Sequence, residues 1–435
     1  MRRAAALLLA IGTCSALCSA TAARAQAPPF NLWYGFIGRA AATNAEHSWL
    51  DGGTGRLALG ERAGWQEAAV GELRLLAEWE PNDRFSAHLH ARARAQDAGS
   101  GGDAVGVVDA WAQLSGEPRG SANDVFRLRA GQFFLPTSRE NQTAVWASPF
   151  TYTLSAINSW IGEEVRPIGL LAEYEVFGDE NSGRAGASVF GGNDASGALL
   201  AWRGWAMGDR LSTFGETLPL PALPSLAEGG LFAGQDHAGT TPIGSDLDGR
   251  PGWAGYLRYQ RTALALVQVT HVDTRGDREL HRIGPRGTGE YAWDTRFDQL
   301  GFQVSPHAYG KFADWTIAGE HLRGTTAMGV PSPAADVDFD ATYLLVSWDY
   351  RSRLSATARW DDFATRDRDH QPTGERSDED GRAWTAALLW SVNQALRLGV
   401  EYVDLRVSRP ALAGPGSRQD GGRSVSLGLR YGYGW

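Results

Sequence analysis

Cysteine is almost absent from this chain of 435 residues, and the two cysteines present, Cys14 and Cys18, lie close to its beginning. The surrounding stretch has a basic start, a run of small and apolar residues, and Ala23-Arg24-Ala25 at its end. This order is typical of a signal peptide with a small-x-small cleavage site. We therefore interpret residues 1–25 as a removed signal peptide. The mature chain, residues 26–435, would then contain no thiols, disulfides or cysteine metal sites.

Long apolar runs are also scarce. The strongly apolar stretch from Ala4 to Ile11 is much shorter than the roughly 20 residues that a membrane-spanning helix needs, and no second long stretch follows. An N-terminal transmembrane anchor, which is the alternative to a signal peptide, is therefore disfavoured. A protein embedded in a membrane by helices is excluded on the same ground.

Positive charge is in the minority. The sequence has 41 Lys and Arg against 50 Asp and Glu, which gives a formal net charge of −9, and Lys311 is its one lysine. Loss of residues 1–25 would remove three further arginines and no acids. A chain this acidic is a poor candidate for general nucleic-acid binding, so no nucleic-acid partner is expected.

What the sequence has instead is alternation. The stretch RFSAHLHARARAQ, residues 84–96, places Phe85, Leu89 and four alanines on one parity and arginine, histidine, serine and glutamine on the other. Side chains of a strand point alternately to its two faces, and a strand that crosses a bilayer needs about nine to eleven residues. Similar segments recur about sixteen times, at residues 30–42, 66–80, 84–96, 104–115, 125–134, 163–177, 184–192, 252–260, 263–273, 293–304, 309–322, 339–350, 353–363, 382–392, 395–406 and 423–435.

The connections between these segments alternate between short and long. Short turns follow the even-numbered segments, whereas Gly-, Pro- and Asp-rich stretches follow most odd-numbered ones, and the longest is 193–251. This rhythm is typical of a transmembrane β-barrel with short periplasmic turns and long extracellular loops. A sheet in hydrocarbon must close on itself to satisfy its backbone. We therefore expect an all-β fold, one antiparallel barrel domain of about sixteen strands, with its apolar parity on lipid and its polar parity on an aqueous lumen.

Aromatic residues cluster at the expected ends of the strands. Barrels place such residues at the membrane interfaces, although aromatic side chains also favour strands in general. The predicted girdle at the short-turn end consists of Trp79, Phe85, Trp348, Tyr350, Trp390, Tyr433 and Trp435. A second girdle is expected at the opposite ends, with Trp253, Trp360, Trp384 and Tyr402.

The last twelve residues, SVSLGLRYGYGW, alternate and end on an aromatic. They resemble the terminal strand that bacterial outer-membrane proteins present to the barrel-assembly machinery. Together with the signal peptide and the loop rhythm, they make the mature chain similar to bacterial porins of the sixteen-stranded kind. The resemblance implies localisation in the outer membrane of a Gram-negative bacterium, contact with lipid and lipopolysaccharide, and a homotrimer.

A more specific likeness lies in LRAGQFFLPTSRENQT, residues 128–143, and GEEVRPIGLLAEYE, residues 162–175. Both are similar to the fifth and sixth strands of the phosphate-selective porin group. The resemblance implies that residues 135–161 fold back into the barrel and narrow the pore. The lysine cluster of that group is missing here, so the likeness does not extend to phosphate selectivity.

Charged residues on the inward parity are the candidate pore-lining groups. An inward arginine has two interpretations, because it either braces the wall in an ion pair or contributes to a cationic face that selects ions. In the second interpretation the arginines of residues 92–94 and 127–129 face a narrowing loop that carries an acid. A pH-dependent role for the strand histidines is disfavoured. The candidates are Arg74, His90, Arg92, Arg94, Asp109, Arg127, Arg129, Glu140, Arg359 and Glu401.

These features predict a passive diffusion channel for ions and small hydrophilic solutes, with a possible bias toward anions, no enzymatic activity and no cofactor. Two alternatives remain open, a secreted soluble β-rich binding protein and an outer-membrane barrel enzyme, although no nucleophile motif supports the latter. A gated receptor with an N-terminal plug is disfavoured because the first strand starts so early. The acidic stretches 246–249 and 336–340 have oxygen-ligand spacing without a full calcium loop, so no metal site is predicted.

Overall fold

The computed structural model describes most of the chain after the predicted signal peptide. The described residues are 29–51, 53–60, 65–95, 105–118, 123–221, 223–227, 230, 232, 242–261, 264–283, 289–305, 313–329, 334–369, 376–409 and 420–432. The predicted signal peptide and the girdle residues Tyr433 and Trp435 lie outside them. No helix in this described part is long and apolar enough to span a bilayer.

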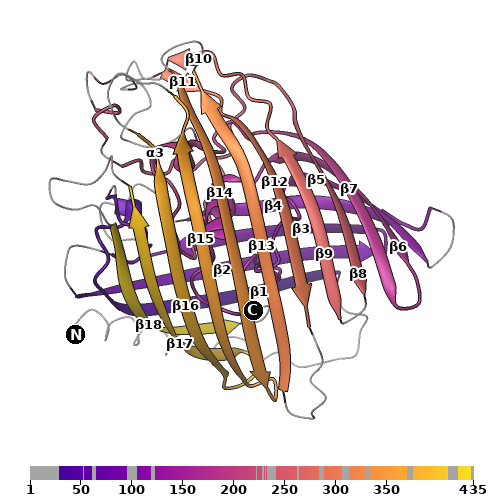
Figure 1. Ribbon diagram of the computed structural model, residues 1–435. Helices are drawn as coiled ribbons and strands as arrows, with labels where there is room; N and C mark the ends of the chain where they lie inside the picture. Colours follow the sequence, from indigo (N-terminus) through magenta and orange to yellow (C-terminus); the bar gives the residue numbers. More distant parts are fainter. Residues whose placement is uncertain are drawn as a thin grey trace.

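Sixteen antiparallel strands close into one barrel (Figure 1). The last strand pairs with the first, so that Phe36 lies opposite Tyr431 and the sheet has no free edge. In chain order the barrel strands are β1 (Phe30–Thr43), β2 (Gln66–Asn82), β3 (Phe85–Arg94), β4 (Val105–Gly116), β5 (Asp124–Gln132), β6 (Ile168–Phe177), β7 (Asn181–Gly191), β8 (Gly252–Arg261), β9 (Ala265–Asp273), β12 (Asp294–Val304), β13 (Ala313–Met328), β14 (Ala335–Tyr350), β15 (Leu354–Asp367), β16 (Glu379–Ser391), β17 (Leu396–Ser408) and β18 (Asp420–Gly432).

The prediction of a sixteen-stranded antiparallel barrel is confirmed, and the largest differences concern where strands begin and end. Strand β6 starts at Ile168 rather than at residue 163, because residues up to Glu164 form a helix capped at its start by Ser155. Strands β13 and β14 reach several residues further toward the long-loop end than expected. The sequence analysis assigns these extensions to a loop, whereas the structure places their charged residues, Arg323, Asp336 and Asp338, on the outward face of the two strands.

The alternation of β2 and β3 matches the two faces of the wall. On β3 the side chain of Leu89 is exposed outside the barrel, whereas that of His90 is fully buried inside it. On β2 the outward Leu73 is exposed, and Leu76 is the apolar exception on the inward parity. Leu76 packs against the segment that joins β5 to β6, so its apolar character serves a contact within the lumen.

The inner face of β12–β17 is not polar near the long-loop end. Phe297, Phe339, Phe363 and Leu405 point inward there and are buried in one apolar cluster. The expectation of a polar lumen-facing parity on every strand is therefore wrong on this side. The physical reason is that helical segments from two loops cover this wall and supply apolar partners for it.

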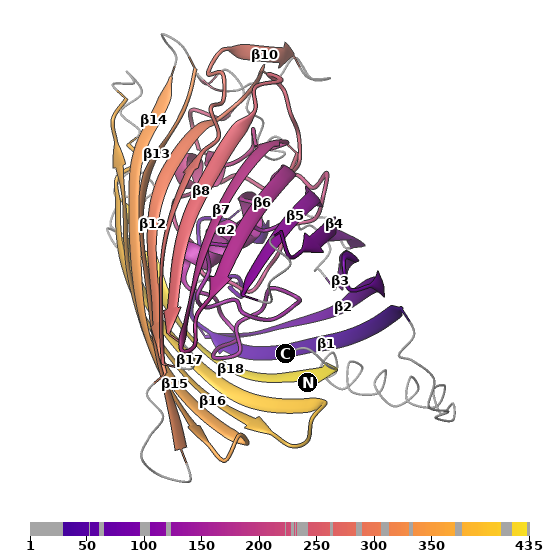
Figure 2. The ribbon, with the colours of Figure 1, turned by 90° about the vertical axis from the view of Figure 1, so that its right-hand side faces the viewer.

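Two short helices lie inside the barrel. Helix α2 (Ala156–Glu164) belongs to the segment between β5 and β6, and α3 (Ala198–Trp202) to the segment between β7 and β8. Figure 2 shows α2 enclosed by the wall, with β12–β14 forming a tall side and β1–β4 a lower one. The ring of Trp160 on α2 meets that of Trp205 edge-on at 5.9 Å. Outside the barrel sheet lie the 3-10 helix η1 (Trp49–Asp51) and the hairpin β10 (Leu280–Ile283) with β11 (Gly289–Tyr291).

Candidate functional site

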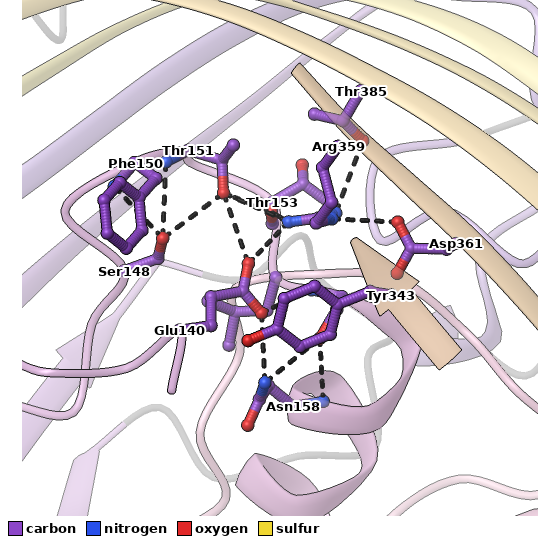
Figure 3. A network of polar contacts seen from close by, with 12 residues as sticks. Glu140, Ser148, Phe150, Thr151, Thr153, Asn158, Tyr343, Arg359, Asp361 and Thr385 are labelled. Carbon is purple, nitrogen blue, oxygen red and sulfur yellow. Dashed lines mark hydrogen bonds and ion pairs between the residues drawn. The ribbon is translucent and has the colours of Figure 1, made fainter. Parts of the chain in front are cut away.

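The segment between β5 and β6 is fixed to the opposite wall by a buried arginine. The guanidinium group of Arg359, on β15, lies 2.5 Å from the Glu140 carboxylate and 2.8 Å from that of Asp361 (Figure 3). It also donates to the backbone oxygen of Thr153 at 2.7 Å. Both carboxylates are inaccessible to water, so the arginine is compensated and cannot attract a passing ion.

A second clamp comes from β17. The Glu401 carboxylate accepts the backbone N–H of Tyr152 at 2.6 Å and of Thr153 at 3.1 Å, and it lies 3.3 Å from the Arg39 guanidinium. Charge-assisted bonds to backbone N–H groups are stronger than neutral ones. They hold the 135–161 segment against β1 and β15–β18. Glu140 and Glu401 therefore position this segment from inside the lumen.

The arginines of β2 and β3 are also paired. Arg94 lies 2.8 Å from the Glu72 carboxylate and 3.1 Å from that of Asp209. Arg74 lies 2.5 Å from the same glutamate. Arg92 binds the Glu216 carboxylate at 3.0 Å. These contacts match the bracing interpretation of inward arginines, because the charges are neutralised by the wall and by the 193–251 segment.

Ion pairing within the lumen perturbs an acid of the 193–251 segment. Burial alone would raise the pKa of Asp209, but the guanidinium groups of Arg94 and Arg39 hold it well below its usual range. The carboxylate therefore remains charged and links β1, β3 and the segment. It has no signal in the sequence, because nothing there indicates that the long segment enters the barrel.

A cavity of about 810 Å³ lies at the short-turn end of the lumen. Part of its lining comes from Phe134–Trp146 of the inner segment, and Arg261 and Leu264 flank the neighbouring turn between β8 and β9. One side carries His88, whose ring stacks on that of Trp111 with centroids 4.7 Å apart. The cavity is thus lined by both aromatic faces and charged groups.

The basic side of this cavity contains three arginines without a carboxylate partner. Among the described residues, no carboxylate oxygen lies within 4 Å of the guanidinium groups of Arg129, Arg139 and Arg258, and all three line the cavity. Arg129 lies 4.0 Å above the Trp111 ring. By contrast Arg127, outside the cavity lining, pairs with Glu175 at 2.8 Å.

The acidic groups of the cavity lining are Asp109 and Glu78. The Asp109 carboxylate lies 3.1 Å from Nδ1 of His90 and 3.2 Å from Nε2 of His88, and the Glu78 carboxylate lies 3.5 Å from Nδ1 of His88. Of the ten candidate pore-lining residues, Asp109 and Arg129 line the cavity, whereas the others are buried under the inner segments or paired in the wall. The sequence analysis missed Arg139 and Arg258. The sequence could have indicated Arg258, because this residue has the inward parity on β8. The position of Arg139 depends on the conformation of the loop and has no such signal.

Glu164 joins the two inner segments. Its carboxylate accepts the indole N–H of Trp160 at 2.7 Å and the backbone N–H groups of Gly197 at 3.0 Å and Leu199 at 2.9 Å. Burial raises the pKa of Glu164 to about 7, although these three donors oppose the shift. The contact between the helices therefore contains a carboxyl group that titrates near neutral pH.

Three carboxylates meet in the 193–251 segment, those of Asp194, Asp246 and Asp248, with ligand atoms within 4.8 Å of one another. Burial raises the pKa of Asp194 to about 6, and the neighbouring charges of Asp248 and Asp246 add to the shift. All three accept backbone N–H groups, for example Leu247 to Asp194 and Gly249 to Asp246. These bonds explain the local loop shape.

Aromatic side chains lie on the outer face at the short-turn end. Trp79 and Phe85 meet edge-on at 5.5 Å beside the first short turn, and Trp348 stacks on Tyr350 at 5.7 Å. Trp390 is about half exposed there. At the opposite end Trp253 and Trp384 point outward.

No protein-family model matches this sequence, and no curated protein matches it either. Solved structures do. The outer membrane channel DcaP of Acinetobacter baumannii is 8% identical, with a TM-score of 0.50 over 93% of this chain and 97% of that chain. OmpF of Salmonella typhi, in a complex with daunomycin, is 10% identical, with a TM-score of 0.50 over 93% and 97%. With its closed sheet of sixteen strands, the chain has the fold of the outer-membrane porins.

Proposed function

We propose that this protein is a passive, non-enzymatic channel of the outer membrane that conducts ions and small hydrophilic solutes. The observation that carries the proposal is the charged cavity of about 810 Å³ inside a closed barrel. The wall places a row of apolar residues outside and fixed charges inside. Solutes would move down their gradients through this lumen and be filtered by its width and charge.

We further propose that the channel favours anions. Fixed charges in a narrow, low-dielectric passage raise the local concentration of ions of opposite sign. Arg129, Arg139 and Arg258 provide this charge, since most other lumenal arginines are compensated by carboxylates. Two carboxylates of the same lining, those of Asp109 and Glu78, oppose this charge, but the three arginines outnumber them.

The proposal includes the setting of the channel. Residues 1–25 would direct export and be removed, the C-terminal strand would engage the barrel-assembly machinery, and the short turns would lie in the periplasm. The aromatic pairs at the short-turn end fit an interface with lipid headgroups. A homotrimer follows from the resemblance to porins and is checked by measuring the mass of the protein in mild detergent.

Planar bilayers test the function directly. The full chain, purified from outer membranes, is added to a bilayer under a salt gradient, and single-channel conductance and reversal potential are recorded. We expect stepwise conductance and a potential of the sign given by anion flow. Absence of steps from correctly folded protein would refute the channel, and a potential of the opposite sign would refute the anion preference alone.

A further inference from the structure

Three buried arginines meet at a short stretch of the 193–251 segment, residues 210–213. Arg92 comes from β3, Arg166 from the end of the segment that joins β5 to β6, and Arg210 from the stretch itself. At most 2% of the surface of each arginine is exposed. Three separate parts of the chain therefore bring positive charge to one place inside the barrel.

Two of these arginines bind consecutive peptide groups of the stretch. The Nε atom of Arg92 donates to the backbone oxygen of Leu211 at 2.5 Å, and Arg166 donates to the backbone oxygen of Ser212. Arg166 also donates to the Ser212 hydroxyl at 2.7 Å. The stretch is thus held from the side of β3 and from the side of the β5–β6 segment.

One carboxylate serves all three guanidinium groups. Glu216 lies 3.0 Å from Arg92 and also pairs with Arg210, and its carboxylate is inaccessible to water. Among the described residues, no carboxylate lies within 4 Å of Arg166. Positive charge therefore exceeds negative charge in this buried cluster.

The Arg166 guanidinium group remains charged in spite of this crowding. Burial lowers its pKa, the positive charges of Arg92 and Arg210 lower it as well, and the resulting pKa is about 10. The carboxylates of Asp109 and Glu216 oppose the shift without reversing it. Because this pKa lies well above neutral pH, the surplus charge is not relieved by loss of a proton. A buried charge without compensation is costly.

Several N–H groups of the cluster also have no acceptor. Among the described residues, none accepts a hydrogen bond from Nη1 of Arg92, from Nε of Arg166, or from Nε and Nη1 of Arg210. Buried donors of this kind in folded proteins point to an ordered water or an ion. Water would satisfy the N–H groups but leave the charge, whereas an anion meets both requirements.

The cluster lies apart from the charged cavity. None of the three arginines lines that cavity, and the ring of Phe134, which does line it, lies 4.9 Å from the Arg166 guanidinium group. The surroundings are tightly packed, since a Cβ atom at Gly106 on β4 would come within 2.5 Å of Thr213. This packing favours a monatomic anion over phosphate or a carboxylate solute.

We propose that Arg92, Arg166 and Arg210 hold a chloride ion inside the barrel. The chloride offsets part of the surplus charge and accepts hydrogen bonds from the N–H groups that lack an acceptor. It joins β3 to both inner segments, so it is a structural ion rather than a solute in transit. The inference goes beyond the proposed function and holds whether or not the barrel conducts.

Bromide is the probe for a direct test, because its anomalous scattering identifies it. Crystals of the purified barrel grown in sodium bromide are measured at the bromine absorption edge. We expect an anomalous peak within hydrogen-bonding reach of guanidinium nitrogens from at least two of the three arginines. Peaks confined to the protein surface, or density without an anomalous signal between the arginines, would overturn the proposal.

Chloride should also stabilise the folded barrel, because a ligand that binds only the folded state shifts the unfolding equilibrium. Unfolding in urea is followed for protein in phospholipid vesicles, in sodium chloride, sodium bromide and sodium gluconate at equal ionic strength. We expect the two halides to raise the urea midpoint relative to gluconate, with a shift that saturates as halide is added. Equal midpoints in the three salts would contradict the site.

Two variants assign this shift to the cluster. Arg166→Gln removes one of the three charges and should abolish the halide shift. Ser212→Asp places a carboxylate beside Arg166, and in gluconate it should reach the midpoint that the natural protein has in chloride. Ser212→Asn is its neutral control and should still respond to chloride. A full halide shift in Ser212→Asp would refute the site even where Arg166→Gln fails to fold.

The cavity arginines provide the remaining control. Arg129→Ala combined with Arg258→Ala should keep the whole halide shift, because these arginines line the cavity and not the cluster. Loss of the shift in this double variant would assign the chloride effect to the cavity and overturn the structural ion. Bilayer recordings of the natural protein are independent of this outcome, so failure of the channel and failure of the chloride site can be distinguished.

Discussion

The ring of Tyr152 lies over Gly428, so closely that a Cβ atom at that glycine would come within 2.5 Å of the ring. Gly428 pairs across the sheet with Gly399, whose own Cβ would also approach the tyrosine. The Arg430 guanidinium lies 4.8 Å from the ring centre. Two facing glycines on β17 and β18 thus form the slot into which the 135–161 segment fits.

Filling this slot should loosen the inner segment. Gly428→Ala adds one methyl group against the tyrosine ring, and such overpacking costs about 1–3 kcal/mol. We expect a lower free energy of unfolding in urea for protein folded in phospholipid vesicles, and a changed single-channel conductance. Gly116→Ala is the control, because no atom lies within 4 Å of its added Cβ. Equal stability of the two variants would contradict the slot.

Removing the Arg359 clamp should have a larger effect. Arg359→Ala leaves the buried carboxylates of Glu140 and Asp361 without their partner, and loss of one member of a buried ion pair costs about 3–5 kcal/mol. We expect faster proteolysis within residues 135–161, measured by limited digestion and mass spectrometry. Arg366→Ala, which breaks a half-exposed pair with Asp380, should leave the digestion rate unchanged.

Stability should fall as pH rises toward neutrality, because of Glu164. Its pKa is about 7 in the folded protein and near 4.5 when exposed, so the folded state binds the extra proton between these values. The free energy of unfolding therefore decreases from about pH 4.5 to about pH 7, by roughly 3 kcal/mol at most. Urea titrations across this range measure the slope. Glu164→Gln cannot titrate, and a slope as steep as that of the natural protein would refute the assignment.

Anion preference should depend on the unpaired arginines rather than on the compensated ones. Arg129→Ala combined with Arg258→Ala removes two cavity charges without exposing a carboxylate partner. We expect the reversal potential under a salt gradient to shift toward cation flow. Arg382→Gln, which removes a charge from the outer wall, should leave the potential unchanged. A shift produced equally by both changes would point to general surface charge instead.

The barrel was largely predictable because its signal is local. Alternation in residues such as Leu89 and His90 follows from the two faces of one strand, and the turn residues mark where each strand ends. The positions of the inner segments within the lumen could not be predicted, because they depend on contacts between residues far apart in the sequence. Asp209 and Glu216 reach Arg94 and Arg92 only after a long stretch folds into the lumen. The inward apolar side chains of Phe339 and Phe363 are explained only by the helices that pack on them.

The candidate site was also predictable only in part. The inward direction of the Arg129 side chain followed from the parity of its strand, but whether it forms an ion pair depends on which neighbouring residues are acidic. Arg127, two residues away on the same face, is compensated by Glu175 across the sheet. Parity identifies which side chains enter the lumen, and cross-strand partners decide which of them keep an effective charge.

The apolar packing inside β12–β17 has a mechanical consequence. On this side the wall is backed by a solid interior, with Trp160, Trp205 and Phe339 in contact, whereas the cavity lies beside β2–β5, β8, β9 and the short-turn end of β12. Transport would therefore run off-centre, along one flank of the cylinder. The opposite side of the wall, stiffened by this packing, would resist deformation and so keep the width of the passage constant when the surrounding bilayer is compressed or thinned.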